Sequence, residues 1–418
     1  MNIEKNAFII RLPRHYLYRM LIFFLTFPHL KPGYFEQFQV LDTLTDMWRL
    51  VSFGIIMIWY FLFRKKISKL ILIFVFMEGY LVANTLMFHG NVKSSMVNAF
   101  SVLSIVLLYD MVEDRKEAFI ESQLFCFELV IYINLLTEFL FPGGLYRTVQ
   151  YSRNWFLGYY NTHTRYFLPA LMFAFLYKNY SGKKARAYAL TAAIFMSAFR
   201  VWSGGIVVTL LLISIVYLLL KNRTAVFNYY SYWLIQPVFF VLVIVLKMQN
   251  LFRWLIDDFL GKWNSLEARV AVWNVEFGLI LKSFLVGYGI QYDEIRRRYY
   301  IWAVHSHNQL LEILHQGGMI YLLFWIGIII MAGKKLWMYK DTESVKVISI
   351  AFLGWSIHSL VEPYTSAFLM GLFVIAYHCR CFQIQENGWE NGQSETVKEE
   401  PAERYQNKRG QIDWFQDS

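Results

Sequence analysis

The chain has 418 residues, of which 57% are hydrophobic and only 17% are charged. Soluble domains carry roughly 25% charged residues, so this balance indicates a protein that lies in lipid. The net charge of +10 does not indicate a nucleic-acid partner, because the lysines gather in short connections between apolar runs and form no long basic face.

Repeated apolar runs predict membrane-spanning helices, since about 18 residues cross roughly 30 Å of hydrocarbon. A β-barrel would give short alternating segments instead. The sequence therefore predicts an all-α, polytopic membrane protein with about 12 transmembrane helices, of which several are short enough to be tilted, re-entrant or partly interfacial. The predicted spans are residues 16–30, 47–63, 69–88, 92–112, 118–141, 163–180, 186–202, 204–220, 229–248, 307–332, 345–360 and 365–380.

Lysine and arginine in the short connections predict the orientation. With twelve spans and both termini in the cytoplasm, every short basic connection falls on the cytoplasmic side, as the positive-inside rule requires. We therefore expect a multi-pass protein of the cytoplasmic (inner) membrane. The connections concerned carry Arg64 to Lys66, Arg115 and Lys116, Lys178 to Arg186, Lys221 and Arg223, and Lys334 and Lys335.

The long connections fall on the opposite, extracytoplasmic side, and the longest is residues 249–306. Its basic residues are mostly arginine, whose planar fork suits phosphate better than lysine does. Within it, residues 265–283 predict an amphipathic helix at the membrane interface. The transmembrane domain is expected to span residues 1–382, and the polar segment 383–418 to be a disordered cytoplasmic tail.

His307 and Asn308 lie at the predicted outer end of the tenth span, in the stretch HSHNQLLEILHQGGMIY. The positive end of the helix would favour an anion there and keep a histidine neutral and able to accept a proton. This pattern suits the activation of a hydroxyl near a phosphate ester. The alternative is a polar residue that only caps the helix.

We expect no metal site and no cofactor. His305 and His315 do not have zinc spacing with any cysteine or paired carboxylate, and the three cysteines are scattered. No outer carboxylates, Glu362 among them, stand out as a pair, and no nucleotide-binding loop occurs. Gly317 and Gly318 predict a close helix–helix contact, because small residues let backbones approach.

Several arginines are candidate substrate ligands at the outer face. Arg165 opens the sixth span and Arg200 ends the seventh, and an arginine near membrane depth indicates a functional site by default. Their alternative role is to reach toward lipid headgroups. Arg296, Arg297 and Arg298 precede the histidine stretch and would add permanent positive charge to it.

These motifs resemble the O-antigen ligase and O-antigen polymerase (Wzy-type) family of membrane glycosyltransferases. His307-Asn308, followed by Gly318 and Tyr321, is similar to that family's histidine signature. Arg269, Trp273, Gly287 and Gly289 are similar to its loop pattern. The resemblance covers about residues 190–330, and beyond these only the topology matches. It implies a GT-C-like fold in which His307 is the base for the acceptor hydroxyl and Arg269 holds a lipid diphosphate.

The resemblance implies transfer of glycan from an undecaprenyl-diphosphate carrier on the outer face of the membrane, without a metal. Our leading hypothesis is the polymerisation of lipid-linked repeat units into a capsule, O-antigen or exopolysaccharide. A ligase that moves finished glycan to lipid A core, wall or protein remains an alternative, as does a transporter of lipid-linked sugar. Expected partners are the lipid-linked glycan, membrane lipid, a flippase and chain-length regulator proteins.

Overall fold

The computed structural model describes residues 14–64, 66–220, 228–248, 263–291, 298, 305–363 and 366–382, and in these ranges the chain is mostly helical. The predicted tail 383–418 lies outside the described residues. A two-residue pair of antiparallel strands, β1 (Asn154–Trp155) and β2 (Gly158–Tyr159), interrupts the helices. The predicted all-α class is confirmed. The α-helices are α1 (Arg14–Leu30), α2 (Gln39–Phe63), α3 (Lys69–Met87), α4 (Val92–Asp110), α5 (Lys116–Leu140), α6 (Thr164–Ser181), α7 (Ala185–Val201), α8 (Gly204–Leu220), α9 (Tyr229–Phe239), α10 (Trp263–Lys282), α12 (Gln309–Met338), α13 (Glu343–His358) and α14 (Ala367–Tyr377).

Each of the twelve predicted spans contains a helix, but the helices differ in length. Among the described residues, five are long and apolar enough to cross a membrane, namely α2, α3, α4, α5 and α12. Helices of this length and apolar composition indicate a protein that is embedded in a membrane. Others are shorter: α14 has 11 residues, which gives about 16 Å of helix, roughly half of the hydrocarbon thickness.

Local sequence explains where many helices begin and end. Ser68 and Asn91 accept hydrogen bonds from the backbone N–H groups of Ile71 and Ser94, so they cap α3 and α4. Gly182 ends α6 in the left-handed conformation, with φ +69°, which glycine adopts without steric cost. The helix ends are thus fixed by short polar residues and glycine, while apolar side chains fill the spans.

The centre of the bundle is aromatic. The Trp355 ring on α13 lies 5.5 Å from Trp233 on α9, 5.8 Å from Trp325 on α12 and 5.4 Å from Phe373 on α14, measured between ring centroids. Large rings in such tilted and edge contacts pack densely and bury much apolar surface. α13, which also packs against α6 and α8, is therefore held on several sides, and so is the turn that follows it.

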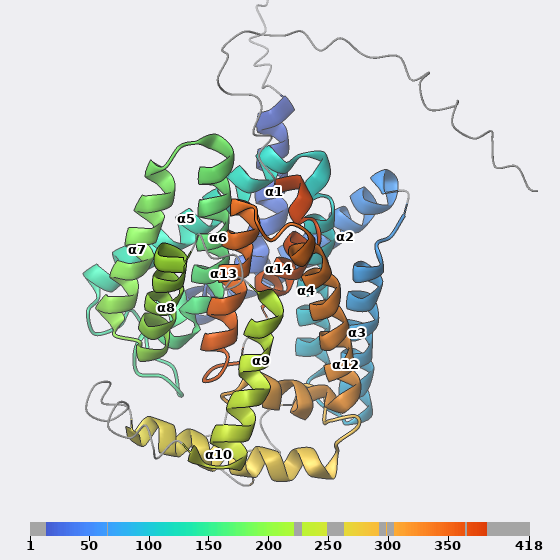
Figure 1. Ribbon diagram of the computed structural model, residues 1–418, viewed down its shortest axis with the longest axis vertical. Helices are drawn as coiled ribbons and strands as arrows, with labels where there is room; N and C mark the ends of the chain where they lie inside the picture. The colour runs from blue at the N-terminus through green and yellow to red at the C-terminus, as the bar shows by residue number, and fades with distance from the viewer. Residues whose placement is uncertain are drawn as a thin grey trace, which may run out of the picture. The chain divides into compact units, whose positions relative to one another are not determined.

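A kink in α12 creates a crosswise layer at one end of the bundle. Gly318 has φ +62° and ψ −158°, which splits α12 into two pieces. In Figure 1 the first piece runs across the view above α10, and the second runs upward beside α3. α10 packs on α12 and buries Val272 and Leu279, as its amphipathic pattern predicts.

The kink rests on close backbone contacts with the turn after α10. The N–H groups of Tyr288 and Gly289 donate to the carbonyls of His315 and Gln316 at 2.8 and 2.7 Å. A Cβ on Gly318 would lie 2.4 Å from the Leu285 carbonyl carbon. The predicted close approach at Gly318 is confirmed, but its partner is a glycine turn and not a second helix, because the positive φ turns the backbone toward that loop.

Candidate functional site

The candidate site centres on Glu362, a carboxylate in the turn after α13 that is only 4% exposed. Its Oε1 lies 3.1 Å from Arg269 Nη2 and 3.4 Å from His307 Nδ1. Its Oε2 lies 3.4 Å from His305 Nε2. A buried carboxylate needs such cationic and hydrogen-bonding neighbours to remain ionised. Glu362 thereby joins α10, the start of α12 and the end of α13 at one point.

The pKa of Glu362 follows from these contacts. Burial alone would raise it, but the contact with His307 and the charges of His305 and Arg269 outweigh burial and lower the pKa from 4.5 to about 2. Glu362 is therefore a carboxylate at every physiological pH. A fixed negative charge beside an imidazole stabilises the imidazolium that forms when the ring accepts a proton.

His307 is held so that its two ring nitrogens face different surroundings. Its Nδ1 is buried and lies 3.4 Å from Glu362 Oε1 without a hydrogen bond of regular geometry, and within the described residues Nε2 makes no hydrogen bond either. The backbone of His307 has φ +51°, a conformation that few residues other than glycine adopt. Strained backbone of this kind concentrates at functional sites. The arrangement sets Nδ1 against Glu362 and leaves Nε2 without a hydrogen-bond partner among the described residues.

The residues beside His307 hold its backbone. Asn308 caps α12 by accepting from Leu311 N–H at 3.1 Å, and its amide donates to the Leu360 carbonyl at 3.3 Å. The N–H of Ser306 donates to Glu312 at 2.9 Å. Asn308 is fully buried, and both ends of its amide bond to the protein backbone, while its predicted contact with substrate stays a prediction.

Arg269 is presented by α10, whose place on the bundle is fixed by a second buried pair. Nδ1 of His315 lies 2.8 Å from the Glu276 carboxylate, and both side chains are almost completely buried. Trp273 is buried one turn after Arg269. His315 is thus a structural link between α10 and α12.

A polar chain extends the site toward α8. Nδ2 of Asn161 lies 3.4 Å from Glu362 Oε1, and Asn161 Oδ1 accepts from the Ser203 hydroxyl at 3.0 Å. Ser203 follows the end of α7, the helix that carries Arg200. The corner between α7 and α8 is therefore tied to the same carboxylate as Arg269 and His307.

The structure does not place the other predicted arginines on Glu362. Arg165 donates to the Tyr166 hydroxyl at 3.0 Å. Arg200 is exposed at the end of α7, and its guanidinium lies 6.0 Å from the centre of the Phe139 ring. Arg298 is exposed, and Arg296 and Arg297 lie outside the described residues. Among the predicted cations that the structure describes, Arg269 contacts the central carboxylate.

His305, His307 and Glu362 could also hold a metal ion, because one ligand atom from each lies within 4.8 Å of the others. Two histidines and a carboxylate are a ligand set that zinc accepts. From the sequence, His305 is considered only together with His315, whereas the fold brings it next to His307 and Glu362. Glu362 is remote in sequence and reaches them only through the fold. The Arg269 guanidinium on the same carboxylate would compete with a metal for it.

Sequence reasoning missed Glu362, Asn161 and His305 as members of the site. Glu362 was recognisable only as one outer carboxylate among several, and Asn161 lies in an aromatic loop without any motif. His305 lies two residues before His307, but from the sequence alone it is weighed only with His315, as a possible zinc ligand. The comparisons with protein-family models and with curated proteins find no match to this chain.

Proposed function

We propose that the protein is an integral-membrane glycosyltransferase that polymerises undecaprenyl-diphosphate-linked oligosaccharide repeat units into a surface polysaccharide on the outer face of the cytoplasmic membrane. One observation carries the proposal: a buried carboxylate holds an arginine and a histidine in contact with itself, and the histidine keeps one nitrogen for a substrate. The motif resemblance at His307, Arg269 and the glycine turn supports the substrate class.

The proposed topology has twelve spans with both termini in the cytoplasm. It is supported by the placement of the site, because Glu362 follows α13 and His307 precedes α12, so both lie at the same end as α10. Lys335 lies near the opposite end of α12, over the Tyr377 ring at 5.5 Å. In this orientation the basic end faces the cytoplasm, and the site faces outward, where lipid-linked repeat units are expected.

The proposed reaction forms a bond between an acceptor hydroxyl oxygen and the anomeric carbon of the donor, and breaks the bond from that carbon to the diphosphate. His307 Nε2 takes the hydroxyl proton, and Glu362 stabilises the resulting imidazolium. Arg269, which must share its charge between Glu362 and the substrate, balances the negative charge on the departing diphosphate. Each group thus acts on a different charge of the same step.

The test replaces His307 by asparagine, which tolerates the left-handed backbone of this position. Surface glycan of high molecular weight should disappear while the protein remains in the membrane at its normal level. His89→Asn is the matched control, because His89 is exposed and has nearly the same φ, +52°. Polymer of normal length in the His307 variant would overturn the catalytic role.

The glycan of a deletion strain separates the polymerase from the ligase. Single repeat units on the cell surface would support polymerisation. Finished polymer that accumulates on the lipid carrier would instead assign a ligase.

A further inference from the structure

A second site lies at the end of the bundle opposite to Glu362, in a cavity of about 340 Å³ between α1, α2, α4 and α5. Its lining is apolar and aromatic apart from one arginine, and it contains no carboxylate. The lining residues are Tyr18, Ile22, Trp59, Phe63, Leu108, Met111, Arg115 and Phe119.

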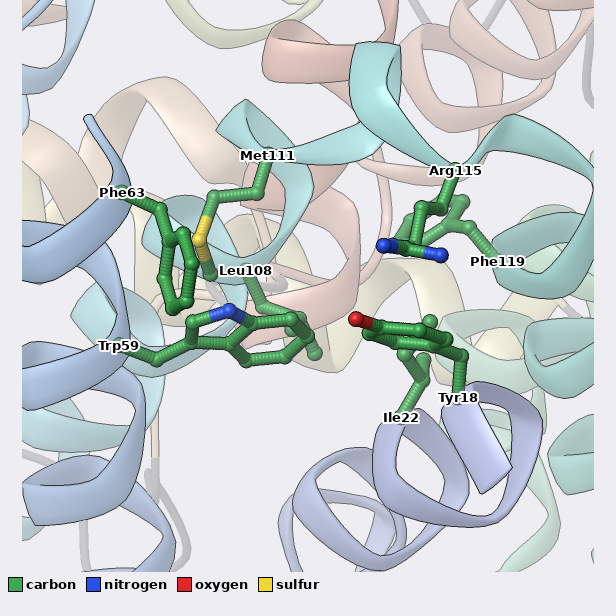
Figure 2. Close-up of a pocket in the computed structure, with 8 residues that line it drawn as sticks. All are labelled: Tyr18, Ile22, Trp59, Phe63, Leu108, Met111, Arg115 and Phe119. Carbon is green, nitrogen blue, oxygen red and sulfur yellow. The ribbon is translucent and has the colours of Figure 1, made fainter. Parts of the chain in front are cut away.

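Two hydrogen-bond donors, the Arg115 guanidinium and the Tyr18 hydroxyl, face this cavity (Figure 2). In Figure 2 the Arg115 guanidinium and the Tyr18 hydroxyl point into the space from one side, and Trp59 and Phe63 form the opposite wall. Within the described part of the chain, the Tyr18 hydroxyl has no hydrogen-bond partner. Arg115 is exposed and Tyr18 partly exposed, so both donors remain accessible to an anionic group that approaches from the membrane surface.

Arg115 differs from the two other arginines nearby. Arg19 pairs with Glu121 at 3.0 Å, and Arg64 lies within 4.0 Å of Asp110. Within the described residues Arg115 has no carboxylate partner, and its guanidinium carbon lies 3.3 Å from the centre of the Tyr18 ring. Among the described residues no carboxylate pairs with its positive charge, and the stacked ring holds the guanidinium in place.

Hydrogen bonds and ion pairs hold the segment just before Arg115 in place. Asp110, at the end of α4, accepts from the Tyr60 hydroxyl at 2.7 Å and lies 2.8 Å from His378 Nε2. His378 also contacts Glu113, in η2 (Val112–Asp114), at 2.9 Å. These contacts join the connection between α4 and α5 to α2 and to the end of α14. The connection that carries Arg115 beside the cavity is thus held by tertiary contacts.

We infer that this cavity binds the phosphate headgroup of an anionic phospholipid from the membrane leaflet at this end of the helices. The phosphate would accept from Arg115 and Tyr18, and the acyl chains would follow the lipid-facing side of α1 and α2, where Met20, Ile58 and Leu62 are exposed. The cavity combines a cation that pairs with no described carboxylate and an apolar wall, which matches a lipid better than a free anion. In the proposed topology this is the cytoplasmic leaflet.

The experiment titrates the purified full-length protein in detergent with phosphatidylglycerol or with phosphatidylcholine, and counts the retained lipids by native mass spectrometry. Phosphatidylglycerol should bind more tightly at one site, and Arg115→Gln should weaken that binding about ten-fold, as expected for the loss of a charged hydrogen bond. Tyr18→Phe, which keeps the ring, should weaken it less.

Lys183→Gln is the charge-matched control, because Lys183 is exposed in the connection between α6 and α7. Unchanged phosphatidylglycerol binding in this variant, together with loss in Arg115→Gln, supports the site. Equal retention of the two lipids, or equal losses in the two variants, would overturn it. A last measurement uses inorganic phosphate as a competitor. If phosphate displaces phosphatidylglycerol and by itself raises the melting temperature of the protein, the cavity binds a free anion and the proposal of a lipid ligand is wrong.

Discussion

Glu362 Oε1 lies 3.4 Å from His307 Nδ1 and 3.1 Å from Arg269 Nη2, so a single carboxylate oxygen contacts both of the residues that the sequence marks as catalytic. The three side chains come from the turn after α13, the bend before α12 and the middle of α10. A change at Glu362 should therefore affect the orientation of the histidine and of the arginine together.

Glu362→Gln is the first test of this arrangement. Glutamine keeps the size but loses the charge, so it can no longer stabilise an imidazolium on His307. We expect polymer synthesis in membranes to fall by roughly 100-fold or more. Glu36→Gln is the control, since Glu36 lies in the predicted connection after α1 on the same side. A near-normal rate for Glu362→Gln would show that the carboxylate only fills space.

The site shows which part of a function can be deduced from local sequence. His307 and Arg269 were predicted because each belongs to a motif, the first at the start of a helix and the second on an amphipathic helix. Glu362 belongs to no motif, and its partners are set by the packing of α13 among α6, α8 and α9. Such contacts depend on tertiary structure, which spacing in one chain does not reveal.

The pH dependence of stability gives a second test. Because the folded pKa of Glu362 is depressed to about 2 from 4.5, its carboxylate stabilises the folded state fully above about pH 4.5. That contribution is lost as the pH falls toward 2. The melting temperatures of the wild type and of Glu362→Gln should therefore differ most above pH 4.5 and converge on acidification. A constant difference from pH 6 to pH 2.5 would contradict the depressed pKa.

Arg269→Lys tests whether the guanidinium fork matters or only its charge. Lysine keeps the charge but cannot make two parallel bonds to a diphosphate or share itself between substrate and Glu362. We expect about a ten-fold loss of rate with lipid-linked repeat units in a purified assay. Arg153→Lys, at an exposed loop position, should leave the rate unchanged. Wild-type kinetics for Arg269→Lys would exclude a bidentate role.

The kink of α12 can be tested separately from the site, through its effect on stability. A Cβ at Gly318 would meet the Leu285 backbone at 2.4 Å, at a φ and ψ that only glycine adopts readily. Gly318→Ala should lower the free energy of unfolding by roughly 1–3 kcal/mol or more. Gly327→Ala, in the straight part of α12, meets only Ile73 Cδ1 at 3.7 Å and should be neutral or stabilising by up to about 1 kcal/mol. Thermal unfolding of both variants measures the difference.

Gly318 also shows where a correct local interpretation reached the wrong partner. The paired glycines indicated a close backbone approach, and this approach exists. The positive φ of Gly318 frees the carbonyls of His315 and Gln316, which then accept from the turn at Tyr288 and Gly289. Neither the kink nor the choice of partner is encoded in the spacing of small residues, because a straight helix contact has the same pattern.

Zinc provides the last test, because the catalytic proposal and the metal cluster use the same atoms. If the proposed glycosyl transfer needs no metal, a chelator such as EDTA should leave its rate unchanged, since Arg269 supplies the positive charge at Glu362. Added zinc should inhibit, because it would bind between His305, His307 and Glu362 and occupy the base. His305→Ala removes one of the three ligands. The zinc concentration that halves the rate of this variant, measured against its own rate without zinc, should be at least roughly ten-fold higher than for the wild type. Loss of activity in EDTA, restored by zinc and not by magnesium, would instead make this cluster a catalytic metal centre, with Arg269 in contact with its ligand Glu362.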